Sequence, residues 1–326
     1  MEYRDYPYQS VLGPYIRDYI AEKRALGFIY NGKAYQMYRF DQYWLSEGFD
    51  DVFITREKVN KWICAFPNES KSSQEGRINA VKSIAIYLSL HGKPCYIPIE
   101  TVGSDHPVIH LMDRSELHQF FMAVDSYAPH TINQADYRMA DEYPIMFRLY
   151  YCCGMRNDEV CSLKTADVDF KEGIVSIRGG KNQKDRLVYL PEDLRVLISA
   201  YYATLKAHLG FDPVWLFPGR IPSKHIPKTS IDRKFREFWN KTESSSHCDR
   251  TPTPHSLRHG FVVDRLNSWI LSGMDINVMF VYLSRYLGHN DPDESFYYYH
   301  LVNDAYRILR QKDTVSADVI PEVRRR

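Results

Sequence analysis

From residue 154 onward, this 326-residue chain holds side chains that together could attack a phosphodiester. Without a metal, such an attack needs fixed cations against the negative charge that develops at phosphorus. Arginine suits this task because it binds two oxygens and stays protonated. The attack also needs a nucleophile, a base and an acid for the departing oxygen. In chain order, the candidates are Arg156, Lys181, His255, Arg258, His289 and the run Tyr297-Tyr298-Tyr299.

Each of these motifs taken alone also has an ordinary structural interpretation. Arg156, which follows Gly-Met, is equally compatible with a surface charge. Glu159, three residues later, is either its helical partner or an exposed carboxylate. Lys181 lies in a glycine-rich turn, where lysines often serve solubility, and the full pattern of a phosphate-binding P-loop is absent.

Metal binding is the alternative for two of the histidines. His255 and His259 are four residues apart and share one helical face, as in metal-binding helices. However, the segment between them lacks the glutamate of a zinc protease, and Arg258 would repel a cation. The six cysteines form no Cys-x-x-Cys pair and no disulfide-like spacing. We therefore predict neither a metal nor a cofactor.

The order of the motifs resembles that of the phage-integrase family of tyrosine site-specific recombinases. That family's active site has an arginine, a hairpin lysine, His-x-x-Arg, a histidine in Leu-Gly-His and a tyrosine in Tyr-x-His. Residues 254–261, Pro-His-Ser-Leu-Arg-His-Gly-Phe, are the most specific short match. The resemblance covers the whole second domain and, less specifically, the N-terminal helices.

The resemblance implies a role for each catalytic residue. Arg156 and Arg258 are expected to clamp the scissile phosphate, with His289 on a non-bridging oxygen. His255 is expected to accept the proton of the tyrosine. Lys181, directly after the glycines of the hairpin, is expected to protonate the leaving group.

Four further residues have supporting roles under the same resemblance. Glu159 is expected to pair with the first arginine, and His259 to support the fold or contact DNA. Lys184 and Arg186, at the hairpin, are expected to contact DNA.

Spacing selects the nucleophile among the three consecutive tyrosines. In the family, the tyrosine lies nine residues after the Leu-Gly-His histidine and two before another histidine. Tyr298 lies nine residues after His289 and two before His300. Tyr297 and Tyr299 point to other faces of a helix. Residues 290–295 differ from the small, hydroxyl-rich segment that the family has after Leu-Gly-His. This difference concerns how the helix that carries the tyrosine is positioned.

The elements that must position these residues form two predicted domains. Apolar residues at helical spacing predict four helices within residues 1–92, a helical core-binding DNA-binding domain. The third helix covers 56–64 after a Thr55 cap, and the fourth starts at a Ser72-x-x-Glu75 capping box. Prolines and glycines mark residues 93–108 as a linker.

Residues 109–326 form the predicted catalytic domain with a C-terminal tail. A helix capped by Asp113-x-x-Glu116 opens it, and an apolar helix leads into Gly154. Two β-rich runs, 174–178 and 185–190, flank a Gly/Asn turn and predict a hairpin. The predicted fold class is mainly α with a small β-sheet: a four-helix core-binding domain plus an α+β catalytic domain.

Composition limits the class of protein without pointing to DNA. The net charge is only +1, so any phosphate-binding face must concentrate cations locally. No run approaches the roughly 18 apolar residues of a membrane helix, and the start lacks the regions of a signal peptide. We therefore expect a cytoplasmic protein, associated with the nucleoid when bound to DNA, and no membrane partner.

The sequence thus predicts a metal- and ATP-independent recombinase that cleaves and rejoins strands through a 3′-phosphotyrosyl bond. Its expected partners are duplex DNA with specific recombination sites and three further copies in a tetramer, for a mobile element or DNA integration. The tail after His300 either docks on a neighbouring copy or folds back on its own domain. Two alternatives stay open: a non-catalytic DNA-binding protein on the same scaffold, and a type IB topoisomerase.

Overall fold

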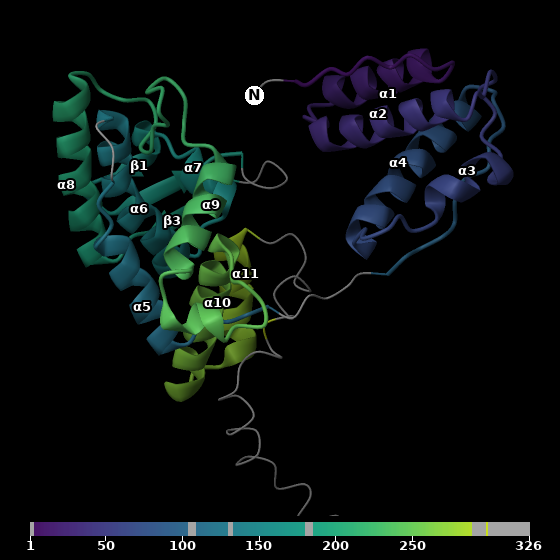
Figure 1. Ribbon diagram of the computed structural model, residues 1–326. Coiled ribbons are helices and arrows are strands. Elements are labelled where there is room, and N and C mark those ends of the chain that lie inside the picture. Colours follow the sequence, from purple (N-terminus) through teal and green to yellow (C-terminus); the bar gives the residue numbers. More distant parts are fainter. Residues whose placement is uncertain (1–2, 104–108, 130–132, 180–184, 289–297, 299–326) are drawn as a thin grey trace, which may run out of the picture. The chain divides into compact units, whose positions relative to one another are not determined.

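The computed structural model describes residues 3–103, 109–129, 133–179, 185–288 and 298. The chain divides into two compact units, Met1–Val108 and Ile109–Arg326, each with its own hydrophobic core (Figure 1). Within the described ranges, no helix has the length and apolar character needed to cross a membrane.

The first unit is a bundle of four helices, as the sequence predicts. They are α1 (Gly13–Ala25), α2 (Asn31–Ser46), α3 (Arg56–Ile63) and α4 (Lys71–Leu90). α2 and α4 pack against each other, and α1 and α3 contact α4. Aromatic residues from α2 and α3 fill much of the core, with Phe40, Trp44 and Trp62 in ring contact.

Two predicted helix starts in this unit have different outcomes. The Thr55 hydroxyl accepts a hydrogen bond from the backbone N–H of Lys58 at 3.4 Å, which confirms Thr55 as a cap. The cap of α4 is Ser70, whose hydroxyl accepts from the Ser73 N–H at 3.2 Å, so the prediction of Ser72 was wrong by two residues. The reason is conformational: Ser70 is extended, with ψ near 148°, and Ser72 already lies inside the helix.

Residues after α4 remain in contact with the first core. The Tyr96 N–H donates to the carbonyl of Ile54 at 2.7 Å, and the Val102 N–H donates to the Glu75 carboxylate at 2.9 Å. Cys95 and Ile97 also pack against this core. This part of the segment predicted as a linker therefore lies on the first unit, whose boundary falls after Val108.

The second unit combines helices with one small sheet. Its helices are α5 (Arg114–Asp125), α6 (Gln134–Cys153), α7 (Asn157–Cys161), α8 (Glu192–Leu209), α9 (Lys228–Trp239), α10 (Pro254–Leu271) and α11 (Ile276–Leu287), with 3₁₀ turns at Thr165–Asp167 and Glu243–Ser246. The predicted capping box of α5 is present, with Asp113 and Glu116 each bonding the other's backbone N–H. The mainly helical fold with a small sheet confirms the predicted fold class.

The sheet has three antiparallel strands in the order β1 (Val168–Asp169), β2 (Ile174–Ile177) and β3 (Arg186–Tyr189). The pairing of β2 with β3 confirms the predicted hairpin, with Val175 opposite Val188 and both buried. β1 was not predicted, because two residues are too few for a period-2 pattern. The turn at 180–184, which holds Lys181 and Lys184, lies outside the described residues.

The helices α6 and α10 pack together near the middle of the second unit, and α10 also contacts α11 (Figure 1). α6 is almost entirely buried along its C-terminal half and ends at Gly154, which is left-handed with φ of 61°. The start of α10 and the ends of α6 and α11 therefore meet, and they bring together three motifs, of which the first and last lie 132 residues apart along the chain.

Candidate active site

The first site arginine is fixed by the turn that follows α6. A Cβ at Gly154 would lie 2.5 Å from the Phe261 ring, so both the left-handed turn and the close approach of α10 require glycine here. Arg156 then caps α7: its backbone N–H donates to Glu159 at 2.8 Å and its Nη1 donates to the same carboxylate at 3.1 Å. Glu159 is thus the partner of Arg156 and not an exposed carboxylate, which was the other interpretation of the sequence.

Glu159 also holds a second arginine. Arg186, on β3, donates from Nη1 and Nη2 to the two oxygens of Glu159 at 2.7 and 2.6 Å. Burial alone would raise the pKa of this carboxyl, but hydrogen bonds and charge from Arg186 and then Arg156 outweigh it and lower the pKa to about 2. The carboxylate is therefore ionised at any physiological pH.

This pairing of Arg186 was not predicted. The sequence predicts that Arg186 contacts DNA, which stays a prediction; in the structure its side chain is 8% exposed and both of its terminal nitrogens bind Glu159. The pattern of the hairpin could not distinguish these outcomes, because Glu159 comes from a different element. Arg186 acts in this structure as a support for the first arginine.

Gly288, at the end of α11, completes the surroundings of Arg156. Its carbonyl accepts a hydrogen bond from Arg156 Nη2 at 2.8 Å. Gly288 is left-handed with φ of 66°, and a Cβ there would lie 3.2 Å from Arg186 Nη1 and 3.3 Å from Arg156 Nη1. The glycine of the Leu-Gly-His motif, which has no side chain, therefore leaves space for the guanidinium groups of both Arg156 and Arg186.

Arg258, on α10, is 1% exposed and is held by two backbone carbonyls. Its Nη1 donates to Gly154 O, and its Nη2 donates to Leu287 O at 3.0 Å. Burial, followed by the nearby charge of Arg156, lowers the pKa of this guanidinium to about 10. Arg258 is still protonated at neutral pH. The carbonyls at the C-terminal ends of α6 and α11 fix its position.

His255 lies one turn before Arg258 on α10 and stays uncharged at neutral pH. Burial of the ring, then the positive charges of Arg258 and Arg156, lower its pKa to about 4. The residue still exposes a substantial part of its surface to solvent, and the two cations lower its pKa in the same direction as burial does. A neutral imidazole at this place can accept a proton or a hydrogen bond.

Tyr298 is buried beside α10, with 3% of its surface exposed. Its hydroxyl lies 2.7 Å from Nδ1 of His259, and its ring packs in the cluster that contains Phe261, Val262 and Leu287. The charge of a Tyr298 phenolate would also act on Arg258. The structure thus joins the selected tyrosine to His259, a contact that sequence reasoning missed.

Among the predicted catalytic residues, the structure brings together Arg156, His255, Arg258 and Tyr298. Lys181, Lys184 and His289 lie outside the described residues, so their predicted roles stay predictions. The two described catalytic arginines and Arg186, set against Glu159, leave two positive charges at the site. Such a cluster can hold a dianionic phosphorane next to a phenolic nucleophile.

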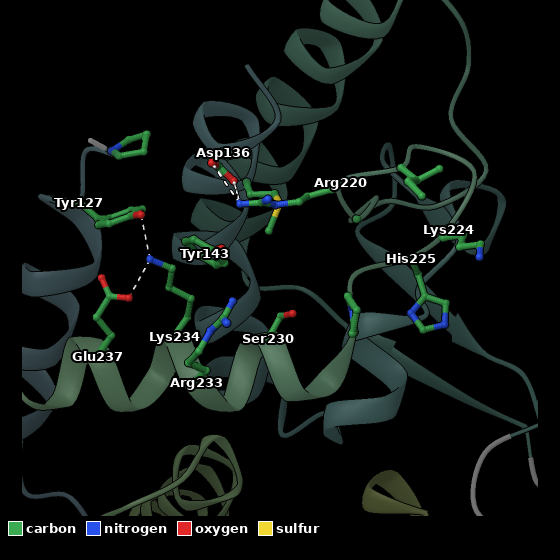
Figure 2. A pocket seen from close by; sticks show the side chains of 15 residues that line it. Tyr127, Asp136, Tyr143, Arg220, Lys224, His225, Ser230, Arg233, Lys234 and Glu237 are labelled. Atoms are coloured by element: carbon green, nitrogen blue, oxygen red, sulfur yellow. Dashed lines mark hydrogen bonds and ion pairs between the residues drawn. The ribbon is translucent and has the colours of Figure 1, made fainter. Parts of the chain in front are cut away.

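A second group of cations surrounds a cavity of about 500 Å³ between α6, α9 and residues 219–227 (Figure 2). Figure 2 shows Lys234 bonded to Tyr127 and Glu237, at 2.8 Å each, and Arg220 paired with Asp136 at 2.9 Å. The cations Lys224 and Arg233 line the same cavity, and both are exposed. This part of the surface therefore concentrates positive charge in a chain whose net charge is only +1.

Comparisons with known proteins identify the family of this chain. The phage integrase family matches residues 112–304. Tyrosine recombinase XerC of Chlamydia caviae is 25% identical over 260 residues, which cover 76% of this chain and 74% of that protein. Tyrosine recombinase XerA of Pyrococcus furiosus is 32% identical over 143 residues, covering 43% of this chain and 44% of that protein.

A solved structure shows the same fold. The XerH site-specific recombinase, bound to its palindromic difH substrate in a post-cleavage complex, aligns with a TM-score of 0.63. It is 18% identical and the match covers 92% of this chain and 82% of that one. At this identity the likeness shows the fold alone.

The family match spans more than half of the chain and contains every described residue of the site, so the chain belongs to the phage integrase family. The predicted class of enzyme, a tyrosine site-specific recombinase that cleaves and rejoins DNA, is confirmed at the level of the family. The non-catalytic alternative is not favoured.

Proposed function

We propose that Tyr298 is the nucleophile that this recombinase uses to cleave one DNA strand at a specific site. The observation that carries this assignment is the convergence of Tyr298, Arg258 and Arg156, which come from three separate motifs. A free phenol has a pKa of about 10 and attacks poorly at neutral pH. Two adjacent guanidinium groups favour both the phenolate and the charge that develops at phosphorus.

The chemical step exchanges one phosphate ester for another. The Tyr298 oxygen gives its proton to a histidine of α10 and forms a bond to phosphorus while the bond from phosphorus to the 5′-oxygen breaks, which leaves a 3′-phosphotyrosyl link. Arg156 and Arg258 clamp the non-bridging oxygens, with His289 as a further donor. Lys181 gives a proton to the departing 5′-oxygen. The reverse step, started by another 5′-hydroxyl, rejoins the strand, so neither a metal nor ATP is required.

The substrate and assembly follow from the class of enzyme. We infer that the substrate is duplex DNA with specific recombination sites and that four copies assemble on two such sites. The XerH structure, in complex with its difH substrate, supports the DNA partner. Residues 1–92 serve as the core-binding domain, and the tail after His300 docks in trans on a neighbouring copy. The enzyme acts in the cytoplasm, on the nucleoid.

The test is a covalent-trapping assay with EDTA present. Wild type and Tyr298→Phe are incubated with labelled duplexes that carry the ends of the genetic element and a nick near the cleavage site. We expect a protein–DNA band with wild type that survives SDS and disappears after protease. Tyr298→Phe should bind the duplex equally well and give no band.

Two matched controls sharpen the assignment. Tyr297→Phe and Tyr299→Phe remove neighbouring hydroxyls and should keep the band. A band from Tyr298→Phe would show that the nucleophile is another residue. Tight binding without a band from any protein would favour the DNA-binding alternative.

A further inference from the structure

The hydroxyl of Tyr298 meets a histidine other than the one expected from the family resemblance. Nδ1 of His259 lies 2.7 Å from the Tyr298 oxygen, and both residues are at least nine-tenths buried. The two ring centroids are 5.4 Å apart. His255, the predicted acceptor, stands next to His259 with ring centroids 4.4 Å apart and planes at 80°.

The geometry of α10 explains why the two histidines differ. Residues 255 and 259 are one turn apart on one helix, so both face the site, but at different heights along the helix axis. His259 is buried against Tyr298, whereas His255 remains accessible to solvent and therefore to a substrate phosphate. The inner histidine touches Tyr298, and the outer one faces solvent.

We propose that His259 is the immediate proton acceptor of Tyr298 and that His255 instead contacts the phosphate. The proposal rests on the proposed function, because it concerns the same nucleophile. As the Tyr298 oxygen bonds to phosphorus, its proton moves to Nδ1 of His259, a transfer that requires the neutral tautomer with its proton on Nε2. When the strand is rejoined, His259 returns the proton to the phenol.

The charges around His259 make this transfer depend on the substrate. The ring of His255 packs against His259, and Arg258 is the neighbouring residue on α10; Arg156 acts on both His255 and Arg258, while Glu159 and Arg186 act on Arg258. Three arginines against one carboxylate leave a net positive charge at the described part of the site, which repels a further positive charge on a neighbouring side chain. The negative charge of the phosphorane offsets this repulsion, so the proton moves only when a phosphate is in place.

The test measures single-turnover formation of the covalent complex on the nicked duplex as a function of pH. In His259→Asn the amide oxygen stands near the position of Nδ1, so it accepts the hydrogen bond but cannot take the proton. His255→Asn is the matched variant one turn away. DNA affinity and far-UV circular dichroism verify that each variant is folded.

We expect His259→Asn to react on the order of 10²-fold more slowly than wild type at pH 7, with unchanged DNA affinity. Its rate should rise about tenfold per pH unit as hydroxide replaces the missing base, while the wild-type rate levels off. Incorporation of a fluorinated tyrosine of lower phenol pKa at 298 should restore His259→Asn more than it accelerates wild type.

Three outcomes would overturn the inference. A wild-type rate and pH profile in His259→Asn would show that the hydrogen bond only positions the ring. The steep pH profile appearing in His255→Asn alone would make His255 the acceptor. A wild type that forms no covalent complex at any pH would contradict the proposed function itself, and the inference with it.

Discussion

Glu159 is the carboxylate that holds Arg156 and Arg186 next to each other. It binds Arg156 through backbone and side chain, and it binds Arg186 through both oxygens. Removing one partner from such a buried network leaves uncompensated charge, which costs more than the interaction itself contributes. Glu159 therefore controls stability and the position of Arg156 together.

We predict that Glu159→Gln destabilises the second unit in a pH-dependent way. The folded pKa of about 2 lies below the reference value of 4.5, so the ionised carboxylate stabilises the fold by about 3 kcal/mol above pH 4.5. This contribution is lost as the pH falls from 4.5 toward 2. Calorimetry from pH 7 to pH 3 should show that the difference in free energy of unfolding between wild type and variant decreases as the pH falls.

The control is Glu192→Gln, which removes a carboxylate from an exposed pair with Arg195. Solvent screens that pair, so no comparable loss is expected. If the difference in free energy of unfolding between wild type and Glu159→Gln stays constant down to pH 3, packing and not charge accounts for the destabilisation.

The sequence predicted which residue types form the site better than it predicted what they touch. The family resemblance selected Arg156 and Arg258, spacing selected Tyr298 among three tyrosines, and the structure brings these three residues together. The contacts of Arg186 with Glu159 and of His259 with Tyr298 join elements far apart in sequence, and a single motif carries no information about them. The glycines of Gly-Met-Arg and Leu-Gly-His were the available signal that two backbones approach the arginines closely.

At the scale of elements, Gly288 links the end of α11 to the arginine pair. We predict that Gly288→Ala slows covalent-complex formation by at least tenfold while leaving DNA affinity within a factor of two or so. The added Cβ would lie 3.2 and 3.3 Å from Arg186 and Arg156, so these guanidinium groups must shift, and small displacements at a reacting centre are costly. Single-turnover kinetics on the nicked duplex measures the effect.

Gly273→Ala supplies a matched control for this prediction. Gly273 ends α10 with φ of 73°, so alanine there carries the same strain of about 1–2 kcal/mol, but its Cβ meets nothing within 4 Å. Equal losses of rate in both variants would attribute the effect to backbone strain and not to the arginines.

Local signals predicted elements well where one residue dominates the end of a helix. Asp113 and Thr55 each cap a helix as expected, because their side chains reach the free N–H groups three residues on. Ser72 was a wrong choice because Ser70 offers the same chemistry two residues earlier, and only the backbone conformation decides between them. The short β1 depends on pairing with β2, which no local pattern encodes.

At the scale of the whole molecule, strand exchange separates a recombinase from a type IB topoisomerase. We predict that the enzyme relaxes supercoiled plasmid negligibly without a recombination site and exchanges strands between two sites. Exchange should depend steeply on protein concentration if four copies assemble on two sites, as we propose. Plasmid relaxation and two-site recombination assays, run with the same preparation and with Tyr298→Phe as a blank, measure both activities. Rapid relaxation of a plasmid without sites would contradict this assignment.

Binding of a polyanion by a chain of net charge +1 requires that its cations be distributed unevenly over the surface. Lys224 and Arg233 lie at the cavity of Figure 2, where the neighbouring cations Arg220 and Lys234 are each paired with a carboxylate. If both contact phosphates, each contributes about 0.9 to the slope of log affinity against log salt. We predict that Lys224→Ala/Arg233→Ala lowers this slope by about 2 and weakens binding similarly on specific and unrelated duplexes.

The matched control for that experiment is Lys171→Ala/Lys206→Ala, which removes the same net charge from two cations paired with Glu172 and Asp212. Anisotropy titrations between about 50 and 200 mM salt, the range over which phosphate contacts dominate affinity, give the slopes.

A change in slope that is confined to Lys224→Ala/Arg233→Ala would place the cavity face on the DNA. Equal changes in both double variants would mean that net charge alone matters, and an unchanged slope in Lys224→Ala/Arg233→Ala would show that this face is turned away from the duplex. The two double variants thereby locate the DNA face of the second unit independently of the active site, since none of the four residues contacts the arginines around Glu159 in the part of the chain that the structure describes.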